Sequence, residues 1–574
     1  MGNSYFLAVG CGVKRLPRRW LRVKRFRPCH RSMPAMRARK TGSLREIHYR
    51  ISWEIHYRIS WEIHYRISWE IHYRISWEVY YVFLTNLFVF RDTMKRLWNL
   101  SLLAMACGSV FSIAQAEPPA GSKLTPLDAY VAKPDDAYHW SLAETIKTGN
   151  LTTHAIRLTS QRWRTEQEVD RPLWEHWLVV TVPAKITTDK VFLMIGGGSH
   201  TSAQPKGPDA ITGAIAATTG GVVAELKNIP NQPLVFHGDG IPRVEDDLIG
   251  YSWAQFLETG DTTWLPRLPM VKSVVRAMDC ITEFSASEAG GKRKVNKFIV
   301  GGGSKRGWTT WMAGAADNRI EAIVPIVIDV ANARPSLQNH AEAYGFWSEA
   351  IGNYYQHKIL QRFNHPRMEE LYRIVDPYYY KERLTLPKYI VNASGDQFFL
   401  PDSSKFYYDE LQGDKLLWYV PNGDHGLKNT DAVQSIAAYY SMICAGKKSP
   451  QYSWSFEKDG SIRVVPVTKP TEVVLWRANN PTARDFRLQT IGPAFESTTL
   501  KADAQGNYVA GPAPEQAGWT ASFVELTYDI GGPFPLKVST GVQITPDALP
   551  FKGIELTEVK YEPEMAGQKT QTGK

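Results

Sequence analysis

Short apolar runs alternate with helical stretches along the middle of the chain. Examples of the helical stretches are residues 268–284 and 431–446. Several of the short apolar runs are apolar at every position, as parallel strands are when helices cover both faces of their sheet. The strands predicted from these runs are 177–183, 190–198, 220–226, 296–303, 322–329, 387–395 and 415–423. This alternation predicts an α/β fold with a doubly wound, mostly parallel sheet.

The pattern changes after Pro450. Residues 451–566 hold short alternating runs separated by Gly, Pro and Asn, without a helical period. They predict a C-terminal β-sandwich domain over 450–566. The α/β domain then covers 117–449, and the stretch 330–386 between two of its strands is expected to form a helical lid. That stretch is rich in aromatic residues, which are expected mainly to pack the core of the lid: Tyr344, Phe346, Trp347, Tyr354, Tyr355 and Tyr378 to Tyr380.

The first 93 residues do not resemble part of a fold. Residues 46–77 are four identical copies of EIHYRISW, and no copy contains a turn residue at which a repeat array could reverse. We interpret residues 1–93 as a spurious or disordered extension ahead of the true start. The alternative is that the Arg-rich stretch 15–45 binds nucleic acid or acidic lipid.

Met94 begins a sequence typical of a secretory signal peptide. A basic pair at 95–96 precedes an apolar run over 97–113, and residues 114–116 (Ala-Gln-Ala) form an A-x-A cleavage site. The apolar run is shorter than the ~20 residues that span a bilayer. We therefore predict a signal peptide over 94–116 and a periplasmic or secreted protein with no stable membrane span after cleavage.

The charge distribution argues against a nucleic-acid partner. The chain carries a formal charge of +10, but residues 1–93 hold 18 Lys/Arg against 6 Asp/Glu, so the remainder is mildly acidic. A broad basic surface is therefore not expected. The sequence has no CxxC pair or other metal-ligand spacing, so we expect neither a metal nor an organic cofactor.

The segment IVGGGSKRGWTTWMAG (299–314) carries the candidate nucleophile. A strand ends in three glycines, Ser304 follows, and a helical pattern begins. This is the order of a nucleophile elbow, where small neighbours permit the strained turn that exposes the serine Oγ. The usual pattern is G-x-S-x-G, but Arg306 occupies the last position and Gly307 comes one residue later. A glycine-rich turn that binds phosphate at a helix start is the competing interpretation.

Two later residues complete a candidate catalytic triad. Asp396 follows one predicted strand and His425 follows the next, and the chain order Ser, Asp, His is that of α/β hydrolases. A serine hydroxyl is a poor nucleophile until an imidazole takes its proton, and a carboxylate must hold that imidazole in the correct tautomer. We favour Asp396 as the acid, with Asp329 at the end of an earlier strand as the alternative.

An oxyanion hole needs backbone N–H donors directed at the developing alkoxide. One donor is expected from Lys305, the residue after the nucleophile. The second is expected from MIGGGSH (194–200), where Gly197 and Gly198 resemble the loop that supplies this donor in lipases and esterases. The alternative is a glycine-rich turn that serves only tight packing.

At these residues the sequence resembles the PhoPQ-activated pathogenicity-related protein family. The matching stretches are GGGSKRGWTTWMAG (301–314), NASGDQFFLPDSS (392–404) and YVPNGDHGL (419–427), and the likeness runs through most of 120–560. The family's elbow resembles S-K-R-G-W, which accounts for Arg306. The resemblance implies an α/β-hydrolase-like fold and an association with secreted or periplasmic proteins under virulence regulation.

These features predict a serine hydrolase, esterase or peptidase-like, that cleaves an ester or amide through an acyl-serine intermediate. Its partner would be a small-molecule or peptide substrate. The alternative is a catalytically inactive binding or signalling protein that has kept the hydrolase fold, because fold alone does not establish activity. Every candidate site residue precedes Pro450, so deletion of residues 451–574 is expected to leave the triad assembled.

Overall fold

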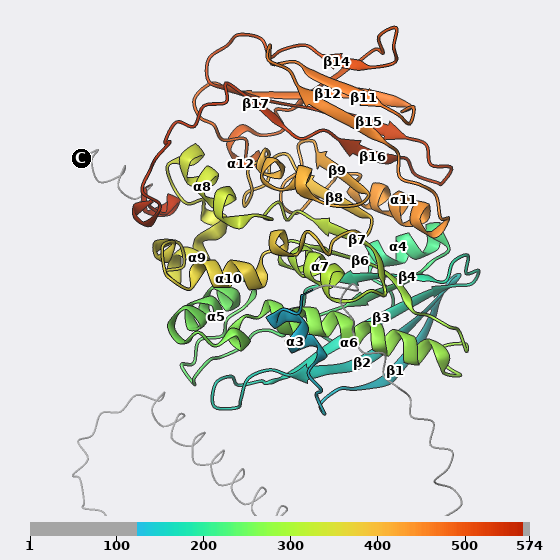
Figure 1. The fold of residues 1–574 in the computed structure, drawn as a ribbon. Helices are drawn as coiled ribbons and strands as arrows, with labels where there is room; N and C mark the ends of the chain where they lie inside the picture. Colours follow the sequence, from blue (N-terminus) through green and yellow to red (C-terminus); the bar gives the residue numbers. More distant parts are fainter. Residues whose placement is uncertain (1–122, 566–574) are drawn as a thin grey trace, which may run out of the picture. The chain divides into compact units, whose positions relative to one another are not determined.

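The computed structural model describes residues 123–565, which are built around a nine-stranded sheet with the strand order β1-β2-β3-β5-β4-β6-β7-β8-β9 (Figure 1). The strands are β1 (His139–Thr148), β2 (Leu151–Arg162), β3 (Leu173–Pro183), β4 (Lys190–Ile195), β5 (Val222–Leu226), β6 (Lys297–Gly303), β7 (Ile320–Ile326), β8 (Lys388–Ala393) and β9 (Lys415–Val420). The first three are antiparallel to their neighbours, and the other six run parallel. The predicted doubly wound, mostly parallel sheet is confirmed.

Successive residues of the strands enter two different hydrophobic cores, as the two-residue period of a strand requires. On β6, Val300 packs in the core that contains helices α3, α5, α6 and α7, whereas Ile299 packs in the core that contains α4 and α11. These helices are α3 (Pro126–Ala132), α4 (Ala210–Thr219), α5 (Glu245–Thr259), α6 (Arg267–Ala286), α7 (Lys305–Ala316) and α11 (Ala432–Cys444). Helices on both faces explain why the parallel strands are continuously apolar.

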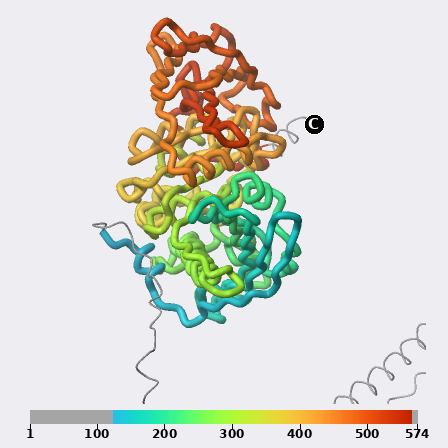
Figure 2. The backbone as a smooth tube through the Cα atoms, turned by 90° about the vertical axis from the view of Figure 1, so that its right-hand side faces the viewer, coloured from blue at the N-terminus to red at the C-terminus, as the bar shows by residue number. Residues whose placement is uncertain are grey.

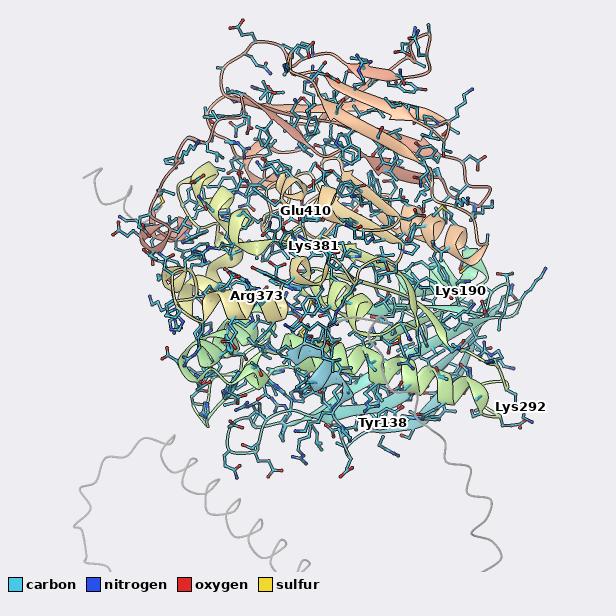
Figure 3. The ribbon with its side chains drawn as sticks, in the orientation of Figure 1. Tyr138, Lys190, Lys292, Arg373, Lys381 and Glu410 are labelled. Atoms are coloured by element: carbon cyan, nitrogen blue, oxygen red, sulfur yellow. The ribbon has the colours of Figure 1, made fainter. Side chains whose placement is uncertain are left out.

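The insertion between β7 and β8 is helical, as predicted for the lid. It contains α8 (Ala333–Tyr344), η2 (Glu349–Ile351), α9 (Gly352–Gln356), η3 (Leu360–Arg362), α10 (Met368–Val375) and η4 (Pro377–Tyr380). Its last turn is tied to the loop after β8, because Lys381 Nζ lies 2.5 Å from a carboxylate oxygen of Glu410; Figure 3 labels the two residues close together. Trp347 in this insertion is fully buried, in line with the expectation that the aromatic residues pack the lid.

The chain after Pro450 forms two antiparallel sheets, which confirms the C-terminal β-sandwich (Figure 2, orange and red). The first sheet contains β10 (Tyr452–Phe456), β11 (Ile462–Pro466) and β14 (Tyr508–Ala510). The second contains β12 (Glu472–Asn480), β13 (Glu496–Thr499), β15 (Trp519–Tyr528), β16 (Leu536–Ser539) and β17 (Gln543–Thr545). Val464 of the first sheet and Val524 of the second share one buried core with Trp418 of β9. The sandwich therefore packs directly on the last strand of the main sheet.

The signal peptide and the octamer repeats predicted over 94–116 and 46–77 lie outside the described residues. Within residues 123–565 no helix is long and apolar enough to cross a bilayer.

Candidate active site

Ser304 lies at a sharp turn between β6 and α7. Its backbone has φ 58° and ψ −128°, a region that is costly for a residue with a side chain and that marks functional turns. The turn is fixed by a hydrogen bond of 2.8 Å from Ser304 N–H to the carbonyl of Ile326 on β7. The predicted strand-to-helix elbow is thus present.

The elbow requires glycine at two positions, and neither is next to Ser304. A Cβ on Gly302 would lie 2.8 Å from the carbonyl oxygen of Arg306, and a Cβ on Gly307 would lie 2.7 Å from the carbonyl oxygen of Gly302. A Cβ on Gly303 would meet nothing within 4 Å. The close approach therefore joins Gly302 to Gly307. This explains why the second glycine is needed at 307, one residue later than in G-x-S-x-G, and why Arg306 can occupy the position where that pattern has its last glycine.

The structure brings Ser304, His425 and Asp396 together at the carboxyl ends of β6, β9 and β8. Ser304 Oγ lies 2.8 Å from Nε2 of His425. Nδ1 of the same ring lies 2.8 and 3.0 Å from the two carboxylate oxygens of Asp396. Parallel strands end at a common edge, so residues 121 positions apart in sequence meet there. This is the geometry in which an imidazole accepts the serine proton while a carboxylate orients the ring.

Backbone groups hold the acid and the base in place. Oδ1 of Asp396 also accepts a hydrogen bond of 2.7 Å from the N–H of Phe398. The backbone N–H of His425 donates to the side-chain oxygen of Gln397 at 3.0 Å, and the ring of Phe398 lies 4.2 Å from the imidazole. The loop 396–399 therefore fixes the carboxylate and the imidazole together.

Asp329, the alternative acid, lies three residues beyond the end of β7 and faces two tyrosines. Tyr407 donates to its Oδ1 at 2.6 Å, and Tyr419 donates to its Oδ2 at 2.5 Å. Burial raises the pKa of Asp329 to about 7. Both carboxylate oxygens are thus occupied by tyrosine hydroxyls, and the position next to His425 is taken by Asp396.

The predicted oxyanion donors belong to the start of α7 and to the loop that follows β4. Lys305 is the first residue of α7, so its N–H belongs to the helix end whose amides have no partner within the helix. On the other side, the parallel register pairs Ile195 of β4 with Gly302 of β6. Gly197 and Gly198 follow the end of β4 by two and three residues, in the loop next to the end of β6.

Arg306 ties these loops together, and sequence patterns did not reveal this role. Its Nε donates to the carbonyl of Ile229 at 2.7 Å, and its Nη2 lies 2.5 Å from Oε1 of Glu245, at the start of α5. A Cβ on Gly197 would lie only 2.8 Å from Nη2 of Arg306. The guanidinium therefore packs on the predicted oxyanion loop while its helix carries the nucleophile.

Glu245 is the common partner of the two cations that follow Ser304. Its second oxygen lies 2.9 Å from Nζ of Lys305, which also lies 3.1 Å from Asp246. Burial acts to raise the pKa of Glu245, but the charges of Arg306 and Lys305 outweigh burial and lower that pKa to about 2. Glu245 is therefore ionised at neutral pH and neutralises charge beside the elbow.

The C-terminal sandwich also contacts the loops of the acid and the base. Leu488 N–H donates to the carbonyl of Gly395 at 3.0 Å, one residue before Asp396. Asn422, three residues before His425, exchanges two hydrogen bonds of 2.9 Å with the backbone of Phe495. We therefore revise the expectation that residues 451–574 are dispensable for assembly of the triad.

A sheet of this order, with Ser304 at an elbow after β6 and Asp396 and His425 after the last two strands, defines an α/β-hydrolase fold. The family model of the PhoPQ-activated pathogenicity-related protein matches residues 127–487. The chain belongs to this family.

One relative is autocrine proliferation repressor protein A of Dictyostelium discoideum, 36% identical over 487 residues that cover 80% of this chain and 95% of the relative. Among solved structures, acetyl xylan esterase 1 from a Thermoanaerobacterium species matches with a TM-score of 0.38 and 12% identity over 57% of this chain and 95% of its own. An acetyl xylan esterase from Paenibacillus sp. R4 matches with a TM-score of 0.38 and 14% identity over 55% and 92%. At this level the likeness of the solved structures concerns the fold, not the reaction.

Among the described residues, no group of three or more His, Cys, Asp and Glu side chains is arranged to hold a metal ion.

Proposed function

We propose that this chain is an exported serine hydrolase that cleaves an ester or amide through an acyl-Ser304 intermediate. The observation that carries the proposal is the hydrogen-bonded series from Ser304 Oγ to His425 Nε2 and from Nδ1 to Asp396. A nucleophile, a base and an orienting carboxylate at these distances are the parts that acyl transfer requires.

In the first half of the reaction, Ser304 Oγ attacks the carbonyl carbon while its proton moves to His425 Nε2. The negative oxygen of the tetrahedral species would accept hydrogen bonds from the N–H groups of Lys305 and of Gly197 or Gly198. The bond to the alcohol or amine then breaks, and the leaving group takes the proton from Nε2. In the second half, water attacks the acyl-serine with the same imidazole as base, releasing the acid and restoring Ser304.

Labelling with a fluorophosphonate probe tests this function directly. The mature wild-type chain should react at one site, and Ser304→Ala should not react. Ser455→Ala, which removes a hydroxyl from an exposed strand of the C-terminal sandwich, is the matched control and should react like wild type. An unlabelled wild type, or a Ser304→Ala variant that labels normally, would remove the basis for the proposal.

A non-catalytic role is the second candidate, and the name of the Dictyostelium relative, a repressor of proliferation, favours considering it. On this hypothesis the fold would present a binding surface, and Ser304→Ala would keep full biological activity. The hydrolase proposal requires instead that the biological effect disappears together with probe labelling.

The export of the proposed hydrolase rests on the sequence after Met94. Cleavage after Ala116 would give a periplasmic or secreted protein that begins at Glu117. N-terminal sequencing of the protein from its native host tests this, and residues 1–93 present at the N-terminus would contradict it.

A further inference from the structure

A cavity opens beside Ser304, between the nucleophile elbow and the helical insertion. The elbow supplies Ser304, Lys305 and Trp308 to its wall, and the segment that follows β7 supplies Ile328 and Val330. The insertion supplies residues from α8 to α10, and Phe398 to Leu400 come from the loop of the acid. The cavity thus begins at the nucleophile and is enclosed by the lid.

Hydrocarbon side chains dominate this wall. The apolar wall residues that come from the insertion and from α5 include Trp253, Leu337, Ile351, Ile359, Leu360 and Phe363. An apolar group transferred from water into such a cavity gains ~25 cal/mol for each Å² of surface that it buries. A charged group gains nothing there unless it finds a free partner of opposite charge.

The chargeable groups in the wall already have partners. Lys305 Nζ is held between Glu245 and Asp246 at 2.9 and 3.1 Å. Asp246 also accepts a hydrogen bond of 3.0 Å from the hydroxyl of Tyr354. A ligand with a charged chain would therefore have to disrupt this ion pair.

His340, the remaining chargeable group in the wall, is neutral. Burial, and next the charge of Arg487, lower its pKa to about 3, and its Nε2 accepts a hydrogen bond of 3.2 Å from the N–H of Ser348. At neutral pH it therefore adds no charge to the cavity.

The position of the cavity assigns it to the acyl side of the substrate. The leaving group must receive a proton from Nε2 of His425, so it has to lie against the imidazole. The wall of the cavity includes Ser304 and Lys305 but not His425, and Phe398, whose ring packs against the imidazole at 4.2 Å, is the wall residue on that side.

We infer that the acyl group accepted by Ser304 is a neutral, apolar chain of several carbons, longer than acetyl. This inference rests on the serine hydrolase proposed above and names its class of substrate: esters or amides of aliphatic acids.

The test compares two series of esters. In the first, the leaving group is p-nitrophenol and the acyl chain grows from acetate through butyrate and hexanoate to octanoate. The value of kcat/KM should rise about fourfold for each added methylene until the cavity is full, which corresponds to ~0.8 kcal/mol of transfer free energy per methylene. In the second, the acid is acetate and the alkyl alcohol grows, and kcat/KM should change little.

A charged chain and two variants sharpen the test. The p-nitrophenyl monoester of succinate, which has the chain length of butyrate but ends in a carboxylate, should react at least ~10-fold more slowly than the butyrate ester. Leu337→Trp, which adds bulk to the wall from α8, should lower the ratio of hexanoate to acetate hydrolysis by about tenfold. Val467→Trp, at a position 81% exposed on the C-terminal sandwich, is the matched control and should keep the wild-type ratio.

A flat acyl series, or a preference for the succinate ester, would overturn the inference while leaving the hydrolase in place. A length dependence found only in the alcohol series would overturn the acyl assignment.

If wild type fails to label with the fluorophosphonate probe, the proposed function fails separately, and calorimetric binding of ethyl hexanoate to Ser304→Ala then decides the nature of the cavity. Binding of the hexanoate ester but not of ethyl acetate supports an apolar acyl cavity, and equal binding or none contradicts it. If Leu337→Trp does not fold, this calorimetric comparison of ethyl hexanoate with ethyl acetate replaces its ratio of hexanoate to acetate hydrolysis.

Discussion

Replacement of Asp396 by asparagine is expected to disable the site without unfolding the chain. Oδ1 of Asp396 accepts a hydrogen bond of 2.7 Å from the N–H of Phe398, and Oδ2 lies 2.8 Å from Nδ1 of His425. An asparagine amide has one acceptor and one donor end. Because the backbone N–H of Phe398 demands an acceptor, the amide NH₂ group would face Nδ1.

That orientation imposes the wrong tautomer on the imidazole. With a donor opposite Nδ1, the ring proton has to sit on Nε2, which then cannot accept the proton of Ser304. The expected loss in kcat is on the order of 10⁴-fold, as when another triad acid is so replaced, or about 5.5 kcal/mol. The assay is hydrolysis of p-nitrophenyl butyrate, with thermal unfolding as the folding control.

Asp329→Asn is the matched comparison. One tyrosine can still donate to the amide oxygen, while the hydroxyl of the other accepts from the amide NH₂. Its effect on kcat should therefore be less than about tenfold, since the new amide has no contact with the imidazole. The reasoning is refuted if Asp329→Asn loses activity and Asp396→Asn keeps near-normal turnover at an unchanged melting temperature. The acid would then be assigned to the end of β7.

Four further expectations follow from the same contacts. Gly307→Ala should abolish probe labelling, because its Cβ would meet the carbonyl of Gly302 at 2.7 Å, whereas Gly303→Ala, which meets nothing, should label normally. Arg306→Met should lower kcat by ~10²-fold through misplacement of the oxyanion loop, with little change in KM for p-nitrophenyl butyrate. The pKa of Asp329, about 7 in the fold against 3.8 normally, makes the folded chain bind the proton more tightly. The contribution of Asp329 to the unfolding free energy therefore decreases as the pH rises from 3.8 to about 7. Denaturant titrations at about pH 5 and about pH 8 should show a smaller decrease in Asp329→Asn than in wild type. Deletion of residues 451–574 should abolish probe labelling, and a truncated protein that labels like wild type would show that the contacts of the sandwich are not needed.

The strands and the candidate triad could be predicted from sequence because both depend on local patterns. The parallel strands are apolar throughout, and Ser304, Asp396 and His425 each follow such a run within a few residues. Since the carboxyl ends of parallel strands share one edge of the sheet, chain order alone was enough to expect them together. The predicted strand 322–329 ends early, at Ile326, because the next residue, Val327, has φ 44° and departs from extended backbone.

The contacts around the triad could not be predicted, because they join segments without a common pattern. Glu245 lies 61 positions from Arg306, and nothing in its own neighbourhood indicates that partner. The requirement for Gly302 and Gly307 rather than Gly303 depends on which backbone atoms approach in space. The acyl cavity likewise takes its wall from α5, the elbow, the insertion and the loop of the acid, a combination set by tertiary packing.

The C-terminal sandwich illustrates why a change in sequence pattern does not mark an independent unit. Arg484 is fully buried and lies 2.6 Å from Asp402, itself buried six residues after the acid of the triad. Loss of Asp402 would leave the charge of Arg484 uncompensated in the interior, at a cost of about 3–5 kcal/mol. Farther along, Trp347 in the helical insertion exchanges backbone hydrogen bonds of 2.8 and 3.0 Å with Lys560 and Glu562.

The last residues of the described chain therefore hold the lid, and the middle of the sandwich holds the loops of the acid and the base. The site and the sandwich share hydrogen bonds, a buried ion pair and one hydrophobic core. Elements connected in this way are expected to unfold together, since no surface between them could be exposed without breaking buried contacts. The boundary visible in the sequence is thus only a change in the type of secondary structure, and the contacts that hold the Ser304 site extend across it.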